Sequence, residues 1–322
     1  MKNIIICSDG TGNEYGPNNT NVVELFSCIS KSDSQIAFYD PGIGTGGWVY
    51  NEEKGKLTAL FDQATGEGLQ KNVEDAYKIL MQIYEEGDQV YLFGFSRGAF
   101  TVRALAGMIH KCGLLYKDNY NLVEYASKLY NTKDNDEVSA GFKNTFSRSC
   151  VIYFIGVWDT VESLVLNAGK KFHNAKLNPT IKYGYQALSI DEKRKDFPPY
   201  LWDEESVETS QTVEQVWFAG VHSDVGGWYK ERGLANISLQ WMARKAMAAG
   251  LKLDESKLNS YKPDPLDQFH ESYTGFWKFR GRHIRSITQG SKIHKSVFER
   301  INDSGVKYKP GNLPESYESV ES

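Results

Sequence analysis

The chain has 322 residues and a formal net charge of −4 at pH 7. Its length and ordinary globular composition allow either one large α/β domain or two small ones with a sizeable core. The negative charge and the lack of a dense run of lysine and arginine argue against nucleic acid as a partner.

Short apolar runs end in turns rich in Gly, Asp and Asn, a pattern typical of strands buried on both faces of a parallel sheet. These runs are residues 4–7, 36–39, 90–95, 151–157 and 213–219. Between them, apolar residues at helical spacing predict helices around residues 73–83, 100–112 and 239–249. The alternation predicts a doubly wound, mostly parallel α/β sheet with helices on both faces.

We expect residues 1–322 to form a single domain. Residues 117–146 and 163–208 fit the predicted sheet less well, and either stretch is a candidate for an insertion over the active site. Roughly the last fifteen residues, rich in Glu, Ser, Pro and Gly, are expected to be frayed.

Other features bear on where the protein is found. The four cysteines are far apart and form no CxxC pair, which argues for a reducing compartment. The apolar run at the N-terminus is too short for a signal peptide, and no stretch has the length needed to span a bilayer. We therefore expect the protein to be cytoplasmic where it is synthesised, and export by a specialised secretion system is left open.

The strongest chemical signal is the string Gly94-Phe95-Ser96-Arg97-Gly98. It follows an apolar strand and opens a helix, as the nucleophile elbow of α/β hydrolases requires. A serine on that strained turn needs small residues on either side, and Gly94 and Gly98 supply them. The turn also aims the backbone N–H of Arg97 at a developing oxyanion. The alternative is a glycine-rich turn that happens to carry a serine.

A nucleophilic serine needs a base, and the sequence favours His222. This residue follows the apolar run 216–221 and precedes a glycine-rich loop, a position where α/β enzymes keep catalytic groups. The alternative is a structural histidine. His110 lies in the helix after the elbow, and the polar surroundings of His173, His270 and His283 have no strand context.

The third member of a triad is an acid that orients the imidazole, and Asp159 follows the apolar run 151–157. The chain order Ser96, Asp159, His222 is that of α/β hydrolases. Asp224 is a competing acid, although we expect it to brace the loop through Asx-type hydrogen bonds. Asp159 could instead be a simple helix N-cap.

A second oxyanion donor is predicted from Asp9, Gly10 and Thr11, in the loop after the first strand. The same Asp-Gly-Thr string is typical of phosphatases that form an aspartyl-phosphate and hold Mg²⁺. Those enzymes place a nucleophilic aspartate two residues earlier, where this chain has Cys7. The glycine-rich loop 42–47 either lines the site or is a turn.

Aromatic residues accompany these motifs. Phe95 and Trp158 would suit an apolar pocket that binds the acyl part of a substrate. Core packing explains them equally well. We retain both interpretations.

Several long motifs together resemble one family. They are Asp-Gly-Thr-Gly-Asn at 9–13, residues 21–23 and 39–45, the elbow and its helix at 94–103, Gly-Val-Trp-Asp-Thr-Val at 156–161, and residues 197–202, 216–227, 293–297 and 312–314. They resemble the α/β-hydrolase domain family that includes type VI secretion phospholipase effectors of the first class. The resemblance implies an α/β-hydrolase-like fold, ester hydrolysis that extends to phospholipid, and a triad of Ser96, Asp159 and His222.

Two departures from that family bear on the substrate. The secreted effectors carry large additional membrane-anchoring segments, whereas this chain is close to the bare catalytic domain. Glu162 stands where the family often has glycine, which adds a charge near the site.

The resulting hypothesis is a serine hydrolase that cleaves carboxylic esters, as a lipase or phospholipase, through an acyl-enzyme. Its partners are an ester or lipid substrate and, transiently, a membrane surface. No metal or organic cofactor is implied, and the oligomeric state is left open. The alternative is a non-catalytic binding or scaffold module on the same fold.

Overall fold

The computed structural model describes residues 1–10, 13, 15–42, 66–161 and 177–321. Its strands are β1 (Asn3–Ser8), β2 (Gln35–Asp40), β3 (Gln89–Phe95), β4 (Leu114–Leu115), β5 (Ser147–Arg148), β6 (Ile152–Trp158), β7 (Tyr183–Ser189), β8 (Thr212–Phe218), β9 (Ser291–His294) and β10 (Tyr317–Val320). Its α-helices are α1 (Asn21–Cys28), α3 (Gly66–Ile83), α4 (Arg97–Cys112), α5 (Val123–Asn131), α6 (Asp136–Phe146), α7 (His222–Gly226), α8 (Gly233–Ala248), α9 (Glu255–Leu258), α10 (Trp277–Arg280) and α11 (Lys295–Asn302). Two 3₁₀ turns are η1 (Tyr120–Leu122) and η3 (Glu204–Ser206).

The described residues form one eight-stranded sheet in the order β10-β9-β8-β7-β6-β3-β1-β2. Every neighbouring pair in it is parallel. Each of the five predicted strands lies in this sheet, and the three predicted helices correspond to α3, α4 and α8. The predicted α/β class and the mostly parallel sheet are therefore confirmed.

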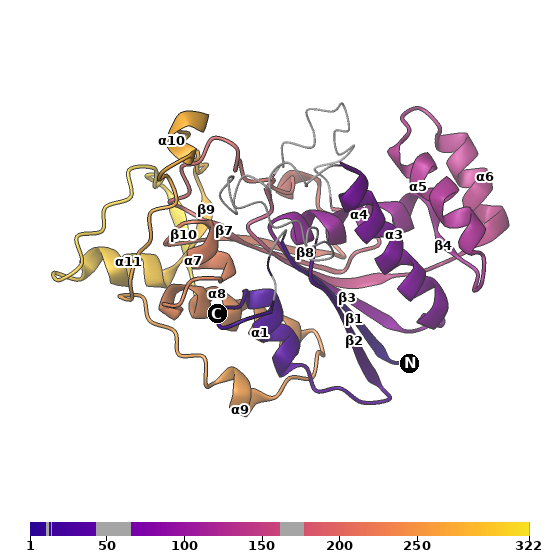
Figure 1. The fold of residues 1–322 in the computed structure, drawn as a ribbon, viewed down its shortest axis with the longest axis horizontal. Helices are drawn as coiled ribbons and strands as arrows, with labels where there is room; N and C mark the ends of the chain where they lie inside the picture. Colours follow the sequence, from indigo (N-terminus) through magenta and orange to yellow (C-terminus); the bar gives the residue numbers. More distant parts are fainter. Residues whose placement is uncertain (11–12, 14, 43–65, 162–176, 322) are drawn as a thin grey trace, which may run out of the picture.

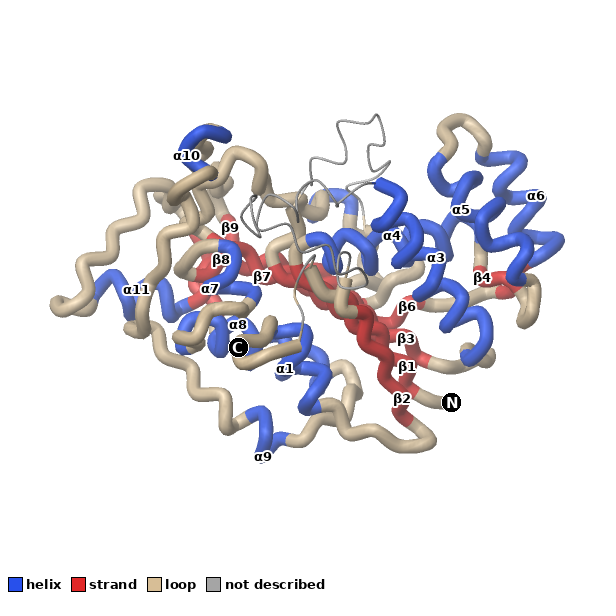
Figure 2. The backbone as a smooth tube through the Cα atoms, in the orientation of Figure 1, coloured by secondary structure: helices blue, strands red, loops and turns tan. Residues whose placement is uncertain are grey.

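Helices cover both faces of the sheet (Figures 1 and 2). On one face, α3 and α4 pack on the central strands through buried residues such as Leu80 and Leu105. On the other face, α1 and α8 bury Leu25 and Trp241 against the same strands. Strands enclosed in this way read as continuous apolar runs because both faces are removed from water.

One expected insertion contains a central strand. β7 lies within residues 163–208 and pairs with β6 on one side and β8 on the other. The expectation of an insertion was wrong for this part of the stretch. Gln186 interrupts the apolar pattern there, yet it is fully buried because Thr160 Oγ1 donates to its Oε1 at 2.7 Å and its Nε2 donates to Tyr200 O.

The C-terminal segment is ordered, contrary to expectation. β10 pairs in parallel with β9 at the edge of the sheet. Its residues are mostly exposed, so the strand lacks the apolar signature on which the prediction relied. An edge strand is held by backbone hydrogen bonds, and these leave no trace in hydropathy.

Residues 117–146 form α5 and α6, which do not lie over the nucleophile elbow. Lys143 of α6 donates to the carbonyl of His110, and the Tyr130 ring of α5 lies against Gly107. Gly107 is eleven residues after Ser96, about 16 Å along α4 at the standard helical rise. Within the described ranges, none of the helices combines the length and apolar character needed to cross a bilayer.

The chain crosses from one side of β1 to the other, one strand in from the β2 edge of the sheet. β1 leads to its neighbour β2, and the chain then returns to form β3 on the opposite edge of β1. Ligands of open α/β sheets bind beyond the carboxyl ends of the strands at such a switch point. Asp9 follows β1 and Ser96 follows β3, so both lie at this position.

The close approach of α4 to β1 yields a stability prediction. A Cβ on Gly98 would lie 2.0 Å from the carbonyl oxygen of Ser8, so Gly98→Ala must push the helix away from the strand. We expect its free energy of unfolding to fall by about 1–3 kcal/mol or more in urea titrations. Gly141→Ala on α6 is the matched control, since nothing lies within 4 Å of its Cβ and helix propensity favours alanine. Equal stability of the two variants would contradict the packing described.

Candidate active site

Ser96 occupies the expected strand-to-helix turn. β3 ends at Phe95 and α4 begins at Arg97, and Ser96 between them has φ 56° and ψ −119°. A positive φ is strained for a residue other than glycine, as a nucleophile elbow requires. The Ser96 N–H donates to the Trp158 carbonyl at 3.0 Å, which ties the turn to the end of β6.

Asp159 and His222 are brought together by the structure. Asp159 directly follows β6, and His222 is the first residue of α7, after β8. His222 Nδ1 lies 2.5 Å from Asp159 Oδ2, and both side chains are buried. A carboxylate on Nδ1 fixes the tautomer in which Nε2 can accept a proton.

The elbow is adjacent to this pair. The Phe95 ring lies against the His222 imidazole with centroids 4.6 Å apart. Among the described contacts, Ser96 Oγ makes no hydrogen bond with His222. Such bonds are often long in a ligand-free enzyme and shorten when substrate binds.

The Asp159 carboxylate is held by a residue that the sequence did not single out. Arg285 Nη1 lies 2.6 Å from Oδ1 and Arg285 Nη2 lies 3.0 Å from Oδ2, a two-pronged ion pair. Ser189 adds its N–H to Oδ1 at 2.9 Å and its hydroxyl to Oδ2 at 3.1 Å. Arg285 is 1 % exposed and also donates to the carbonyls of Ser189 and Phe197. The carboxylate is thus satisfied from three segments of the chain, including His222.

These contacts determine the ionisation of the pair. Burial raises the pKa of Asp159, but the Arg285 charge and the hydrogen bond from His222 outweigh it and hold that pKa well below its usual range. Burial lowers the pKa of His222, against the opposing effect of Asp159. Near pH 7 the site therefore contains an ionised Asp159 and a neutral His222, the protonation states that general-base chemistry needs.

Glu192 binds the backbone N–H of His222. It accepts the His222 N–H at 3.3 Å and forms a two-pronged pair with Arg194, at 2.9 and 2.8 Å. Burial raises the pKa of Glu192, but Arg194 lowers it to about 2 overall. The Ser272 hydroxyl donates to the same carboxylate at 2.9 Å. Glu192 therefore remains charged and fixes the start of α7.

The competing acid Asp224 does not contact His222. Its carboxylate lies 2.6 Å from His270 Nδ1 and accepts the N–H of Val221 at 3.1 Å, so it braces the loop. The remaining histidines do not approach Ser96 in the described contacts. His294 caps α11, His110 lies near the end of α4, His283 is exposed, and His173 lies outside the described residues.

The predicted oxyanion donors are only partly described. Arg97 opens the first turn of α4, as expected. The Asp9 N–H donates to Asp40 O at 2.9 Å and the Gly10 N–H donates to Asp9 Oδ1 at 2.7 Å, so both amides are engaged. Thr11 lies outside the described residues. Its role as a donor stays a prediction.

The Asp9 side chain is buried and held by hydrogen bonds. It is 1 % exposed, and its carboxylate accepts hydrogen bonds from Thr20 at 2.5 Å, Tyr39 at 3.0 Å and Asn13 at 3.1 Å. Burial raises the pKa of Asp9 to about 6. The aspartyl-phosphatase alternative needs its nucleophile at residue 7, where the Cys7 thiol is fully buried in the core, and this argues against it. Gly42, at φ 81°, packs on the Asp9 carbonyl, and the rest of the loop 43–47 lies outside the described residues.

Phe95 and Trp158 are core residues in this structure. They are 2 % and 0 % exposed, and both belong to the cluster that α1 and α8 cover. A Cβ on Gly226 would meet the Phe95 ring at 2.0 Å, which shows how tightly that ring is enclosed. The structure favours packing over substrate binding for both residues.

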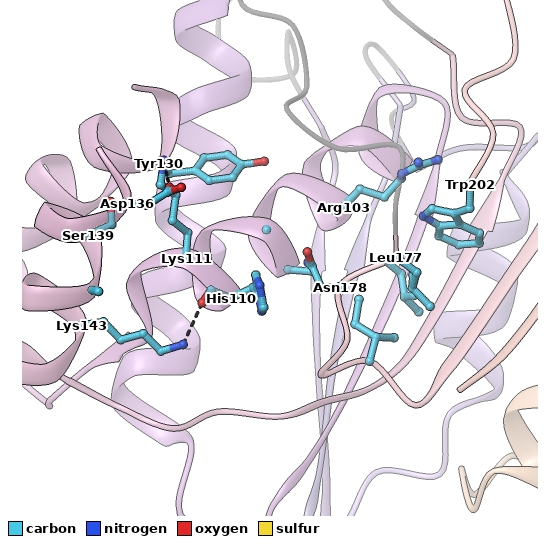
Figure 3. A pocket seen from close by; sticks show the side chains of 15 residues that line it. Arg103, His110, Lys111, Tyr130, Asp136, Ser139, Lys143, Leu177, Asn178 and Trp202 are labelled. Atoms are coloured by element: carbon cyan, nitrogen blue, oxygen red, sulfur yellow. Dashed lines mark hydrogen bonds and ion pairs between the residues drawn. The ribbon is translucent and has the colours of Figure 1, made fainter. Parts of the chain in front are cut away.

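A cavity of about 600 Å³ lies along the far half of α4 (Figure 3). None of Ser96, Asp159 and His222 lines it. Its cations already have partners: Arg103 donates to Tyr200 O, Lys143 to His110 O and Lys111 to Thr132 O. The cavity is lined by α4, α5 and α6 and, across from them, by Leu177, Asn178 and Trp202, and we do not place the reaction in it because it is separate from the three predicted site residues.

Comparison with known proteins identifies a family. The family model described as "T6SS, Phospholipase effector Tle1-like, catalytic domain" matches residues 2–245. The uncharacterized protein YEL023C of Saccharomyces cerevisiae is 35 % identical over 217 residues, which are 61 % of this chain and 32 % of the yeast protein. The chain therefore spans about a third of the length of that curated relative.

Two solved structures are similar at lower identity. An uncharacterized protein from Pseudomonas aeruginosa is 18 % identical with a TM-score of 0.47, covering 82 % of this chain and 49 % of that chain. The Tle1 effector bound to the VgrG spike of the type 6 secretion system is 17 % identical with a TM-score of 0.40, covering 70 % of this chain and 51 % of that chain.

The ionisation of His222 can be measured directly. Because burial lowers its pKa, the imidazole should titrate below the usual value of about 6.5 in an NMR pH titration. Asp159→Asn removes the charge that opposes this shift, so the pKa of His222 should fall further. A pKa that rises or stays constant in Asp159→Asn would contradict the pairing.

Arg285 should matter more to stability than a comparably buried arginine. Arg285→Gln leaves the buried Asp159 charge without its ion pair, at an expected cost of about 3–5 kcal/mol. Arg300→Gln is the matched control, because Arg300 is also buried but donates to the carbonyls of Pro265 and Asp267. Its expected cost is about 1–3 kcal/mol in the same urea titration. An equal or larger loss for Arg300→Gln would contradict the role given to Arg285.

Proposed function

The chain belongs to the family of Tle1-like type VI secretion phospholipase effector catalytic domains, and on this premise we propose that it is a serine hydrolase acting on the carboxylic esters of phospholipids. The observation that supports this most directly is the buried pair of Asp159 and His222, 2.5 Å apart, beside the strained turn of Ser96. A neutral histidine oriented by a carboxylate is the base that a serine nucleophile needs.

The proposed reaction is acyl transfer to water in two steps. His222 Nε2 takes the Ser96 Oγ proton as the oxygen attacks the ester carbonyl, and the N–H of Arg97 stabilises the oxyanion. Collapse of the intermediate breaks the ester bond and His222 gives its proton to the leaving alcohol. Water, deprotonated by His222, then hydrolyses the acyl-enzyme and Ser96 recovers its proton.

Asp159 keeps its charge throughout this cycle. With Arg285 on one side and the imidazole on the other, it orients His222 and stabilises the imidazolium without taking the proton. Each oxyanion donor contributes about 10²–10³ in rate in enzymes of this type. Thr11 is retained in the proposal as the second donor.

We also propose that residues 1–322 act as a single catalytic domain. The family model ends at residue 245, yet Arg285 contacts Asp159 and Ser272 contacts Glu192. The segment beyond the matched region thus contributes to the site. Export through a type VI secretion apparatus is a further part of the proposal, which rests on the family description alone.

Substrate class is tested by comparing hydrolysis of short-chain soluble esters and of phospholipid vesicles by the full chain. We expect acyl-chain release from phospholipid, and a loss of about 10³-fold or more in Ser96→Ala and in His222→Ala. Ser223→Ala, beside His222, is the control for nonspecific effects of a serine substitution and should retain activity.

Three outcomes would count against the proposal in different ways. Turnover confined to soluble esters would remove the phospholipase assignment. Full activity of Ser96→Ala would remove the serine mechanism. No hydrolysis of any ester would favour the scaffold alternative.

A further inference from the structure

The segment around α10 exposes aromatic side chains at the periphery of the molecule. Phe279 is 90 % exposed and Phe276 is 46 % exposed, and Ile284 just after the helix is 56 % exposed. Figure 1 shows α10 at the edge of the structure, on the side opposite α9. Single exposed apolar residues are ordinary, but three within nine positions of one segment are unusual.

The same segment is strongly basic. No aspartate or glutamate occurs between Glu271 and Glu299, whereas lysine or arginine occurs at 278, 280, 282, 285, 292 and 295. Lys278 and Arg282 have no carboxylate partner among the described residues, although Arg280 pairs with Asp196 at 2.8 Å. The exposed part of the segment therefore has an uncompensated positive charge.

A neighbouring loop adds to this charge. Residues 193–195 run beside residues 281–283: Lys195 N donates to Gly281 O, and His283 N donates to Lys193 O. Lys195 has no carboxylate partner among the described residues, and Lys193 pairs with Glu271 at 2.7 Å. We call Phe276, Phe279, Ile284, Lys195, Lys278 and Arg282 the α10 rim.

The helix α10 that carries the rim is connected to His222 by two ring contacts. Trp277, the buried residue of α10, packs edge-on against Phe197 with centroids 5.3 Å apart. Phe197 packs in turn against His222 at 5.1 Å. A surface bound by α10 would thus lie two ring contacts away from His222 of the candidate site.

We propose that the α10 rim docks the protein on an anionic phospholipid surface. Exposed phenylalanine can insert at the level of the lipid headgroups, while lysine and arginine attract anionic lipids at the surface. Phe276 and Phe279 are exposed beside Lys278 and Arg282, and this combination of apolar rings with positive charge complements a layer of anionic headgroups. The inference rests on the proposed function for its purpose, since docking would deliver the lipid ester to Ser96.

The test separates docking from hydrolysis by using Ser96→Ala protein, which leaves the vesicles intact. Co-sedimentation is measured with vesicles of phosphatidylcholine alone and with added phosphatidylglycerol. We expect the anionic vesicles to bind about tenfold more tightly or better, and this preference to weaken as salt is added. Equal binding to both vesicle types, or none to either, would overturn the proposal.

Two variants in the Ser96→Ala background locate the surface. Phe279→Ser and the double variant Lys278→Gln/Arg282→Gln should each weaken binding to anionic vesicles by about tenfold. Phe146→Ser on α6 and the double variant Lys252→Gln/Lys257→Gln, before and within α9, are matched controls at other exposed positions, and they should bind like the parent. Unfolding midpoints verify that each variant is folded.

Binding by Phe279→Ser equal to that of Phe146→Ser would overturn the assignment to α10. If the Ser96 enzyme hydrolyses no lipid but the rim variants still lose binding, the proposed function fails and docking is supported. The two proposals can therefore fail separately.

Discussion

A single buried charge organises the candidate site. Asp159 is removed from water at the end of β6, and an ionised carboxylate in that position is stable only if opposite charge and hydrogen-bond donors surround it. Arg285, Ser189 and His222 meet this requirement from three separate segments of the chain. The contacts that stabilise the Asp159 carboxylate also fix the orientation of the His222 imidazole. The proposed chemistry and the stability of the site therefore depend on the same contacts.

The parallel sheet makes this arrangement possible. The carboxyl ends of β1, β3, β6 and β8 lie on the same side of the sheet. The residues that follow them are Asp9, Ser96, Asp159 and, after a short connection, His222. Side chains remote in sequence meet there because parallel strands present their carboxyl ends together. The strained turn at Ser96 depends on the close contact of Gly98 with the backbone of β1, so the elbow is fixed by packing as well as by its own sequence.

Much of the fold could be predicted because the central strands are apolar throughout. The sequence does not reveal β7 because Gln186 is buried through hydrogen bonds to distant residues, and it does not reveal β10 because an exposed edge strand has no hydropathy signal.

The candidate site could be predicted in part. The strand-end positions and the chain order indicate Ser96, Asp159 and His222, and their catalytic roles remain proposals. Arg285 could not be found from sequence, since one arginine in a basic stretch gives no sign that it points inward while Ile284 points outward. The sequence likewise does not show that the apolar side chains of the α10 rim are exposed, because their exposure depends on the fold.

The most direct test is the reaction of the intact chain with a fluorophosphonate, followed by peptide mapping of the adduct by mass spectrometry. A serine activated by the pair of His222 and Asp159 should be phosphonylated at Ser96, at a rate that falls as His222 becomes protonated. Folded protein that forms no adduct at Ser96, or reacts equally at other serines, would contradict the activated nucleophile.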